Sequence, residues 1–250
     1  MCRMVLLWGN FSGQFRSIFK SLSDVAQDDP LLRKGSKTFS HKDGWGYLNV
    51  SGESIELRRF AAPLNFKVRP PSAKDGVALI HARAAAKGEG MGILNAHPFH
   101  SQDETYDVYI THNGWFDKYM MNKALGLESV TKMNDTEVFL KLIMNQNGPI
   151  DERVKAALEL SKRNDYMKGG ANIYVAGLKR GTSRASIIYH TDTAPEREYG
   201  EYNKLYFIEG KNWSGVISSS IKLSKYFPKG VKIGDVERGK VYVTNVNLSN

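Results

Sequence analysis

The sequence predicts a layered α+β fold, organised as a single domain of residues 1–250. Apolar segments of strand length come first, amphipathic helices follow in the middle of the chain, and a second set of strands completes it. Because strands and helices do not alternate regularly, the pattern argues against a doubly wound parallel sheet. A length of 250 residues suits one large domain. No repeat, low-complexity tract or Pro/Gly-rich linker divides the chain.

The first two predicted elements are a buried strand and an amphipathic helix. The apolar run of residues 3–7 follows Cys2 and ends at the turn residues Trp8-Gly9-Asn10. The helix covers residues 14–26 and ends before Asp28-Asp29-Pro30. Its apolar residues recur at helical spacing: Phe15, Ile18, Phe19, Leu22 and Val25. These side chains are expected in the core, and Cys2 is expected at the edge of a strand.

Several strands are predicted before the central helices. Residues 45–50 and 54–60 form a hairpin around Ser51-Gly52, and residues 77–81 form a buried strand. Residues 107–111 form another strand, which leads into Asn113-Gly114. This dipeptide favours positive φ, so it predicts a tight turn.

Two helices and a second set of strands follow. The helices cover residues 135–147 and 151–161, with Gly148-Pro149 between them, and they predict a helical layer. The later strands are expected at residues 172–178, 186–190, 204–209, 214–218 and 240–245.

Composition excludes several classes of protein. No segment approaches the roughly 18 apolar residues that a membrane span requires, and residues 1–7 are too short for a signal peptide. The protein is therefore expected in the cytoplasm, with no membrane partner. The net charge of +9 comes from dispersed basic residues without a nucleic-acid motif, so it predicts a solvated basic surface and no nucleic-acid partner. Such a charge also suits an anionic substrate or an acidic partner.

Cys2 is the one cysteine of the chain, so no internal disulfide can form. Initiator methionine is normally removed before a small residue, which would leave Cys2 with a free α-amine beside its own thiol. A thiol has a pKa near 8.5 and an α-amine has one near 7.7–8.0, so the amine can take the thiol proton close to neutral pH. Position alone also allows the alternative that Cys2 is an ordinary small apolar residue at a strand start.

Further motifs favour the catalytic interpretation. They are Met1-Cys2-Arg3, Asp43-Gly44-Trp45-Gly46, His81-Ala82-Arg83, Asn95-Ala96-His97-Pro98-Phe99, His112-Asn113-Gly114 and Asn134-Asp135-Thr136-Glu137. In type and order they resemble the class II glutamine amidotransferases, which are N-terminal-nucleophile hydrolases. The resemblance is greatest to the stand-alone branch of small predicted amidotransferases, which includes γ-glutamyl hydrolases. It implies a four-layer αββα sandwich, in which two antiparallel sheets lie between helical layers.

The resemblance also assigns roles that suit the chemistry of each residue. Arg83 offers paired donors for the α-carboxylate of glutamine, with a structural salt bridge as the alternative. Asp135 is assigned to the α-ammonium group, with a helix N-cap as the alternative, although Asn134 could cap instead. The side-chain NH₂ of Asn113 and the backbone N–H of Gly114 would form an oxyanion hole. His97 is expected to support substrate binding.

No cofactor and no metal are expected. The six histidines lack metal-ligand spacing and no second cysteine is present. His81, His100 and His112 are expected to be structural histidines. Asp43 to Gly46 is expected to form a turn beside the nucleophile, with Trp45 in the core or in the wall of the pocket.

Departures from the family pattern leave the substrate and the partner open. Ala84 and Ala86 stand where the sugar-phosphate-aminating branch has Trp and Thr, so a γ-glutamyl peptide or amide is an alternative to free glutamine. The chain also lacks a synthase domain, so it either hydrolyses its substrate or hands ammonia to a separate synthase or acceptor subunit. Two further alternatives are a non-catalytic glutamine-sensing or assembly subunit, and an N-terminal-cysteine hydrolase of bile-salt or penicillin amides. The Asn113-Gly114 and Asp135 to Glu137 motifs favour the amidotransferases.

Overall fold

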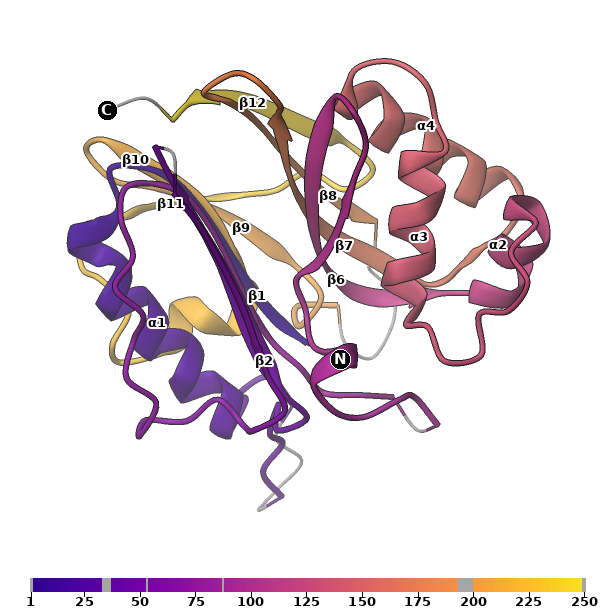
Figure 1. Cartoon of the computed structure of the whole chain (residues 1–250). Coiled ribbons are helices and arrows are strands. Elements are labelled where there is room, and N and C mark those ends of the chain that lie inside the picture. Colours follow the sequence, from indigo (N-terminus) through magenta and orange to yellow (C-terminus); the bar gives the residue numbers. More distant parts are fainter. Residues whose placement is uncertain (1, 33–36, 53, 87, 193–199, 249–250) are drawn as a thin grey trace.

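Two antiparallel sheets pack face to face, with helices on the outer side of each (Figure 1). The computed structural model describes residues 2–32, 37–52, 54–86, 88–192 and 200–248. Its elements are β1 (Arg3–Gly9), α1 (Ser12–Gln27), β2 (Trp45–Ser51), β3 (Ser54–Phe60), β4 (Gly76–Ala82), η1 (Ile93–Asn95), β5 (Phe99–Gln102), β6 (Tyr106–Phe116), α2 (Lys118–Leu125), α3 (Asp135–Met144), α4 (Ile150–Arg163), β7 (Met167–Lys179), β8 (Arg184–Asp192), β9 (Leu205–Glu209), β10 (Trp213–Ser218), η2 (Ser219–Leu223), β11 (Lys232–Asp235) and β12 (Val241–Asn247).

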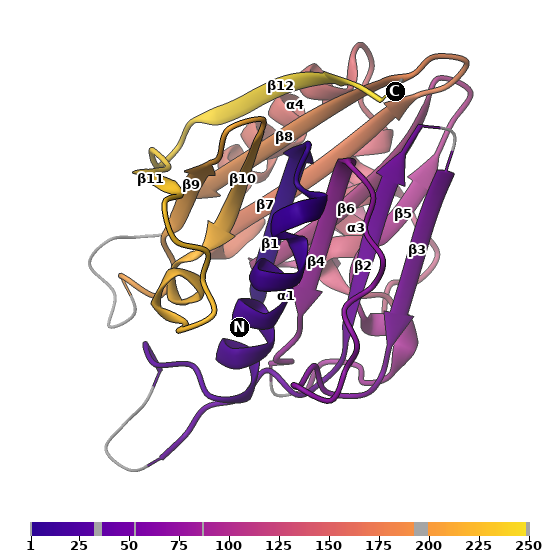
Figure 2. The same ribbon diagram turned by 90° about the vertical axis from the view of Figure 1, so that its left-hand side faces the viewer.

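The seven-stranded sheet has the order β11-β9-β10-β1-β4-β2-β3, and α1 lies across its outer face (Figure 2). Strand β1 is central, so both of its faces are buried. Val5 and Leu7 pack in the cluster that contains the apolar side of α1, whereas Met4 and Leu6 pack toward the second sheet. This double burial explains why the first strand has a continuous apolar sequence and no alternation.

The five-stranded sheet has the order β12-β8-β7-β6-β5, and α2, α3 and α4 cover its outer face (Figure 1). A separate apolar cluster fills the space between the two sheets, with side chains such as Leu79 from one sheet and Tyr174 from the other. The helices, sheets and three apolar clusters together form the four-layer αββα sandwich that the family resemblance implied.

Every predicted strand and helix is present, with some changes in length. Among the described residues, two strands, one α-helix and the two short 3-10 helices η1 and η2 were not predicted. Strands β5 and β11 have four residues each, which is too short for a clear alternating pattern. Helix α2 has eight residues and starts at the N-cap Asp117, whose carboxylate accepts the N–H groups of Tyr119 and Met120. Among the described residues, no helix combines the length and the apolar character that crossing a membrane demands.

The prediction of a tight turn at Asn113-Gly114 is wrong. Both residues lie inside β6, where Asn113 pairs with Asn172 and Gly114 pairs with Ala171 of β7. Glycine is required at position 114 because the backbone of β7 approaches closely there, and not because φ is positive. A Cβ at Gly114 would clash with the carbonyl oxygen of Gly170. A β-bulge follows between Gly114 and Phe116, so the irregularity comes one residue later than the sequence suggested.

Candidate active site

All six predicted site residues line one cavity of about 690 Å³. They are Cys2, Arg83, His97, Asn113, Gly114 and Asp135. The cavity lies where the start of β1, the end of β4, the end of β6 and the first turn of α3 meet, so both sheets contribute to it. Residues more than 130 positions apart in the sequence are therefore brought together by the packing of the two sheets.

Cys2 lines this cavity, is buried and directly precedes β1. Its backbone nitrogen donates to Oδ1 of Asn113 at 2.7 Å, and its Sγ lies 3.8 Å from the carbonyl oxygen of Ala84. The hydroxyl of Tyr202 donates to the Cys2 carbonyl oxygen at 3.4 Å. Cys2 is thus held by Asn113 of the second sheet and by Tyr202, which lies outside both sheets. Met1 lies outside the described residues, so its removal stays a prediction.

Asn113 and Gly114 face the same space as the thiol. Because Oδ1 of Asn113 accepts from Cys2, Nδ2 is the end of the side-chain amide that can donate to a ligand. An oxyanion formed by attack of Sγ would develop beside this donor. The geometry is compatible with the predicted oxyanion hole, and that role remains a prediction.

Arg83 follows β4 directly and is fully buried. Its backbone N–H donates to the Gly44 carbonyl oxygen at 2.9 Å, and its Nη2 donates to Oε2 of Glu89 at 3.0 Å. The salt bridge given above as the alternative is therefore present. However, Nη1 of the same guanidinium has no hydrogen-bond partner among the described residues. A buried charged donor without a partner is costly, so this group is suited to an anionic ligand in the cavity.

Asp135 begins α3, and its neighbour Asn134 is the N-cap, whose side chain accepts the N–H of Thr136 at 3.0 Å. The capping alternative for Asp135 is therefore not needed. The Asp135 carboxylate accepts the backbone N–H of Phe116 at 2.9 Å and that of Thr136 at 2.8 Å. Burial raises the pKa of Asp135 in spite of these bonds. A cationic group in the cavity would oppose that effect and stabilise the carboxylate.

A cluster of buried histidines borders the cavity, and two of them, His97 and His112, line it. His97 and His112 both contact the hydroxyl of Thr136, at 3.0 Å and 3.1 Å, and the ring of His97 stacks on that of His81 with centroids 4.1 Å apart. Burial lowers the pKa of His112 to about 3 and holds the pKa values of His81 and His97 well below 6.5. These rings are neutral near pH 7, which agrees with a structural and positioning role.

Several residues that line the cavity were not predicted as site residues, among them Glu89, Trp115, Lys118, Tyr119 and Thr136. Thr136 stands inside a motif that was singled out, so its place beside Asp135 was a usable signal. Glu89 lies between two glycines, which suggested only a loop. Lys118 donates to the carbonyl oxygen of Met133 at 2.8 Å, a contact that depends on the tertiary fold.

Two other expectations concern the turn and the metal. Gly44 has a φ of +117°, as a glycine-permitted turn requires, and Asp43 accepts the N–H of Ala85 at 2.9 Å. Trp45 packs in the cluster under α1 and does not line the cavity. In the part of the chain that the structure describes, no group of three or more His, Cys, Asp or Glu side chains could hold a metal ion.

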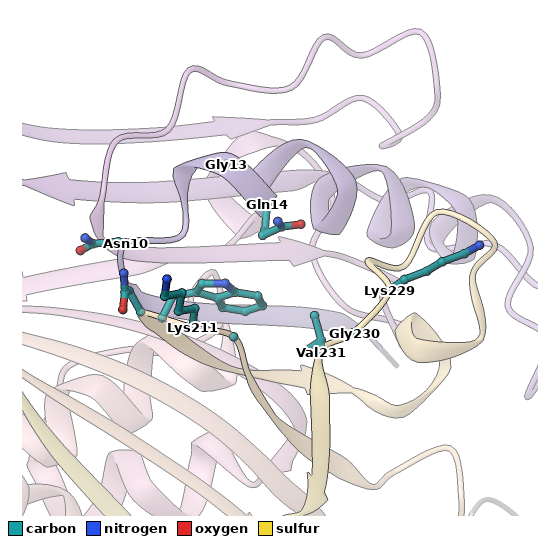
Figure 3. Close-up of a pocket in the computed structure, with 10 residues that line it drawn as sticks. Asn10, Gly13, Gln14, Lys211, Lys229, Gly230 and Val231 are labelled. Carbon is teal, nitrogen blue, oxygen red and sulfur yellow. The ribbon is translucent and has the colours of Figure 1, made fainter.

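A second cavity of about 310 Å³ lies near the other end of β1 and the start of α1 (Figure 3). Its lining includes Asn10, Gln14, Lys211 and Lys229. None of the predicted site residues lines this second cavity.

Comparison with known proteins supports the fold. No protein-family model matches the chain, and no curated protein matches it significantly. Among solved structures, the chain is similar to one described as the allosteric regulatory enzyme of purine biosynthesis, with a TM-score of 0.68 and 18% sequence identity over 99% of this chain. This similarity supports the αββα fold, in which two antiparallel sheets lie between helical layers. The chain spans about half of that neighbour, 49% of its length, and at this identity the match concerns the fold alone.

Proposed function

We propose that this chain is an amidohydrolase that cleaves the γ-glutamyl amide of glutamine or of a γ-glutamyl compound, through a thioester on Cys2. The observation that carries the proposal is the 2.7 Å bond between the Cys2 nitrogen and Asn113, in a cavity that also contains Arg83 and Asp135. Cleavage of this substrate requires a nucleophile and a hydrogen-bond donor to the oxyanion. Binding of its amino-acid head requires a cation and an anion. The solved neighbour is described as an enzyme, which supports a catalytic function for the shared fold.

The first half-reaction would form the thioester. After Met1 is removed, the Cys2 α-amine takes the thiol proton and Sγ attacks the γ-carbonyl carbon. The C–S bond forms while the carbonyl electron pair moves onto oxygen, where Asn113 Nδ2 and the Gly114 N–H would stabilise it. The oxyanion then collapses, the C–N bond breaks, and the ammonium group of Cys2 returns the proton to the departing nitrogen. Ammonia or an amine is released.

Water completes the reaction. It attacks the thioester carbonyl carbon and gives one proton to the Cys2 amine. The C–S bond breaks, the proton passes to sulfur, and the γ-carboxyl group of the product is released. The buried histidines are not needed as bases, because their pKa values lie far below neutrality. We propose water as the acceptor, with a separate synthase subunit as the alternative that would consume the ammonia.

The two charged residues would bind the amino-acid head of the substrate. Arg83 presents its unpartnered Nη1 for the α-carboxylate, and Asp135 presents a buried carboxylate for the α-ammonium group. A charge-assisted hydrogen bond contributes about 1.5–3 kcal/mol, so loss of either residue should cost on the order of 10- to 100-fold in binding.

Intact-mass measurement with the glutamine analogue 6-diazo-5-oxo-L-norleucine tests this proposal. We expect a protein that lacks Met1 and gains one adduct, located on Cys2. Cys2→Ala should lose Met1 equally and gain no adduct. Arg83→Met and Asp135→Asn should be labelled on the order of 10- to 100-fold more slowly at low analogue concentration. Arg58→Met, at an arginine whose side chain is 64% exposed, is the matched control and should be labelled at the wild-type rate.

Two results would contradict the proposal. Turnover of a γ-glutamyl amide by Cys2→Ala would exclude the thioester mechanism. Complete removal of Met1 with no adduct on the wild-type protein would favour the non-catalytic alternative or a substrate outside the glutamine class.

A further inference from the structure

Two large aromatic side chains lie at the mouth of the candidate active site without being buried. Trp115 is 57% exposed and Tyr119 is 60% exposed, and both line the cavity that contains Cys2. An exposed aromatic pair in a concave site is unusual, because such side chains are normally covered in the folded chain. The pair therefore points to a ligand that covers it.

The local backbone fixes where these side chains lie. Trp115 lies at the register shift between Gly114 and Phe116, where three residues of β7, 168–170, face this one residue of β6. Such bulges beside active sites commonly redirect a side chain. Strand β7 runs close by, since a Cβ added at Gly169 would lie 3.1 Å from the Trp115 Cβ. Tyr119 stands in the first turn of α2, where its N–H donates to Asp117 at 3.1 Å. Both positions are thus set by regular structure and by a helix cap.

The burial gradient gives the cavity two ends. Arg83 is 1% exposed and Asp135 is 7% exposed, so the charged pair is at the inner end with Cys2. Trp115 and Tyr119 are at the outer end. A γ-glutamyl substrate that places its charged head on the inner pair must extend its amine portion toward the aromatic mouth.

The size of the cavity favours a substrate larger than glutamine. One water molecule takes up roughly 30 Å³ in the liquid, which is a generous volume for each non-hydrogen atom of a ligand. At that volume per atom, glutamine would fill less than half of the 690 Å³ cavity. Ala84 and Ala86 line the cavity with side chains of a single methyl group, which keeps this space open.

We infer that Trp115 and Tyr119 form a leaving-group subsite for the amine portion of a γ-glutamyl amide, and that this portion carries an aromatic or flat apolar group. The inference rests on the proposed function. Aromatic rings packed in offset or edge-to-face geometry gain free energy beyond the burial of their area, and the amide bond cleaved would lie between the charged head and this ring. Free glutamine, which releases ammonia, leaves the subsite empty and is the poorer substrate.

The test compares γ-glutamyl-phenethylamide with γ-glutamyl-ethylamide, which release amines of similar basicity and differ in the ring. We expect wild-type kcat/KM to be about tenfold higher for the phenethylamide. Trp115→Ala should reduce this ratio to about one, Tyr119→Ala should reduce it in part, and Trp115→Phe should retain most of it. Phe66→Ala is the control, because Phe66 is 49% exposed and does not line the cavity, so it should keep both rate constants.

The outcomes separate the inference from the proposed function. Equal kcat/KM for the two amides, or a ratio that Trp115→Ala leaves unchanged, would overturn the leaving-group subsite while the amidohydrolase function stands. Hydrolysis of neither amide by a protein that also gains no Cys2 adduct would overturn both.

Discussion

Two buried arginines lie near Cys2, and their surroundings differ. Arg3 follows Cys2 directly on β1, and Arg83 follows β4, the strand that pairs with β1. Both side chains are almost completely inaccessible, with exposures of 0% and 1% for the residues. Burial alone therefore does not separate a structural arginine from a binding arginine.

The partners of Arg3 come from distant parts of the chain. Its guanidinium pairs with Asp29, donates to the carbonyl oxygen of Tyr202 at 2.9 Å and lies 3.4 Å from the centroid of the Tyr202 ring. Asp29 also contacts His41 and accepts from Ser220, both at 3.0 Å. Arg3 lines neither of the two cavities described above. This region fixes the start of the chain.

Among the described residues, the Arg83 guanidinium has one side-chain partner, Glu89, which is partly exposed, and Arg83 lines the cavity. This difference shows that a binding arginine is distinguished from a structural one by the surroundings of the N–H group that has no hydrogen-bond partner. In Arg3, Nη2 has no hydrogen-bond partner among the described residues, and it belongs to a guanidinium that lies over the Tyr202 ring. In Arg83, Nη1 has no such partner, and it belongs to a residue that lines the cavity. The first arrangement stabilises a fold and the second can bind an anion.

The largest expected effect is on stability, and it separates the two arginines. Arg3→Met leaves the Asp29 carboxylate buried without its cation, so unfolding in urea should show a loss of about 3–5 kcal/mol. Arg83→Met leaves the Glu89 carboxylate without its cation, but that carboxylate reaches solvent, so the free energy of unfolding should fall by about 1 kcal/mol or less. Labelling of Cys2 by the glutamine analogue should instead slow in Arg83→Met. Equal losses of stability in the two variants would remove the distinction.

The sequence predicted more of the site than of its surroundings. Cys2, Arg83, Asn113 and Asp135 could be found because each stands in a short motif whose chemistry is local. The leaving-group subsite could not be predicted, because the exposure of Trp115 depends on a bulge that forms only when β6 pairs with β7. The layered α+β class followed from apolar periodicity alone, whereas the four-layer sandwich came from the family resemblance, since strand order depends on contacts between distant residues.

Acid should destabilise the fold first through its buried histidines, most of which lie beside the cavity, and only at lower pH through the Asp29 carboxylate of the Arg3 region. Burial places the pKa values of His81, His97 and His112 below 6.5, so the unfolded chain binds more protons than the folded chain below that pH. Their contribution to stability is full above pH 6.5 and falls as the pH decreases, with a limiting slope of about 1.4 kcal/mol per pH unit for each histidine. For His112 this window extends down to about pH 3.

In the Arg3 region, the Asp29 carboxylate loses its contribution to stability at a lower pH than the histidines do. Burial would raise the pKa of Asp29, but hydrogen bonds and charge from His41 and Arg3 lower it to about 2, so its contribution is lost as the pH falls from 3.8 to about 2. His41 has a lowered pKa as well and adds one histidine to the earlier phase. Urea unfolding at several pH values checks this order. A free energy of unfolding that is constant between pH 6.5 and pH 5 would contradict the assignment of buried neutral histidines.

The smallest expected effect concerns Glu89, which shares Arg83 with the proposed substrate. Its carboxylate lies 3.0 Å from Nη2 and competes with an α-carboxylate for the same guanidinium. Glu89→Gln removes the competing charge, so KM for a γ-glutamyl amide should fall by about threefold to fivefold with kcat unchanged, as a partly exposed ion pair of about 1 kcal/mol or less implies. Glu89→Asp keeps the charge and is the control. A rise in KM for Glu89→Gln would instead mean that Glu89 orients Arg83, and the two arginines would then both depend on a carboxylate partner.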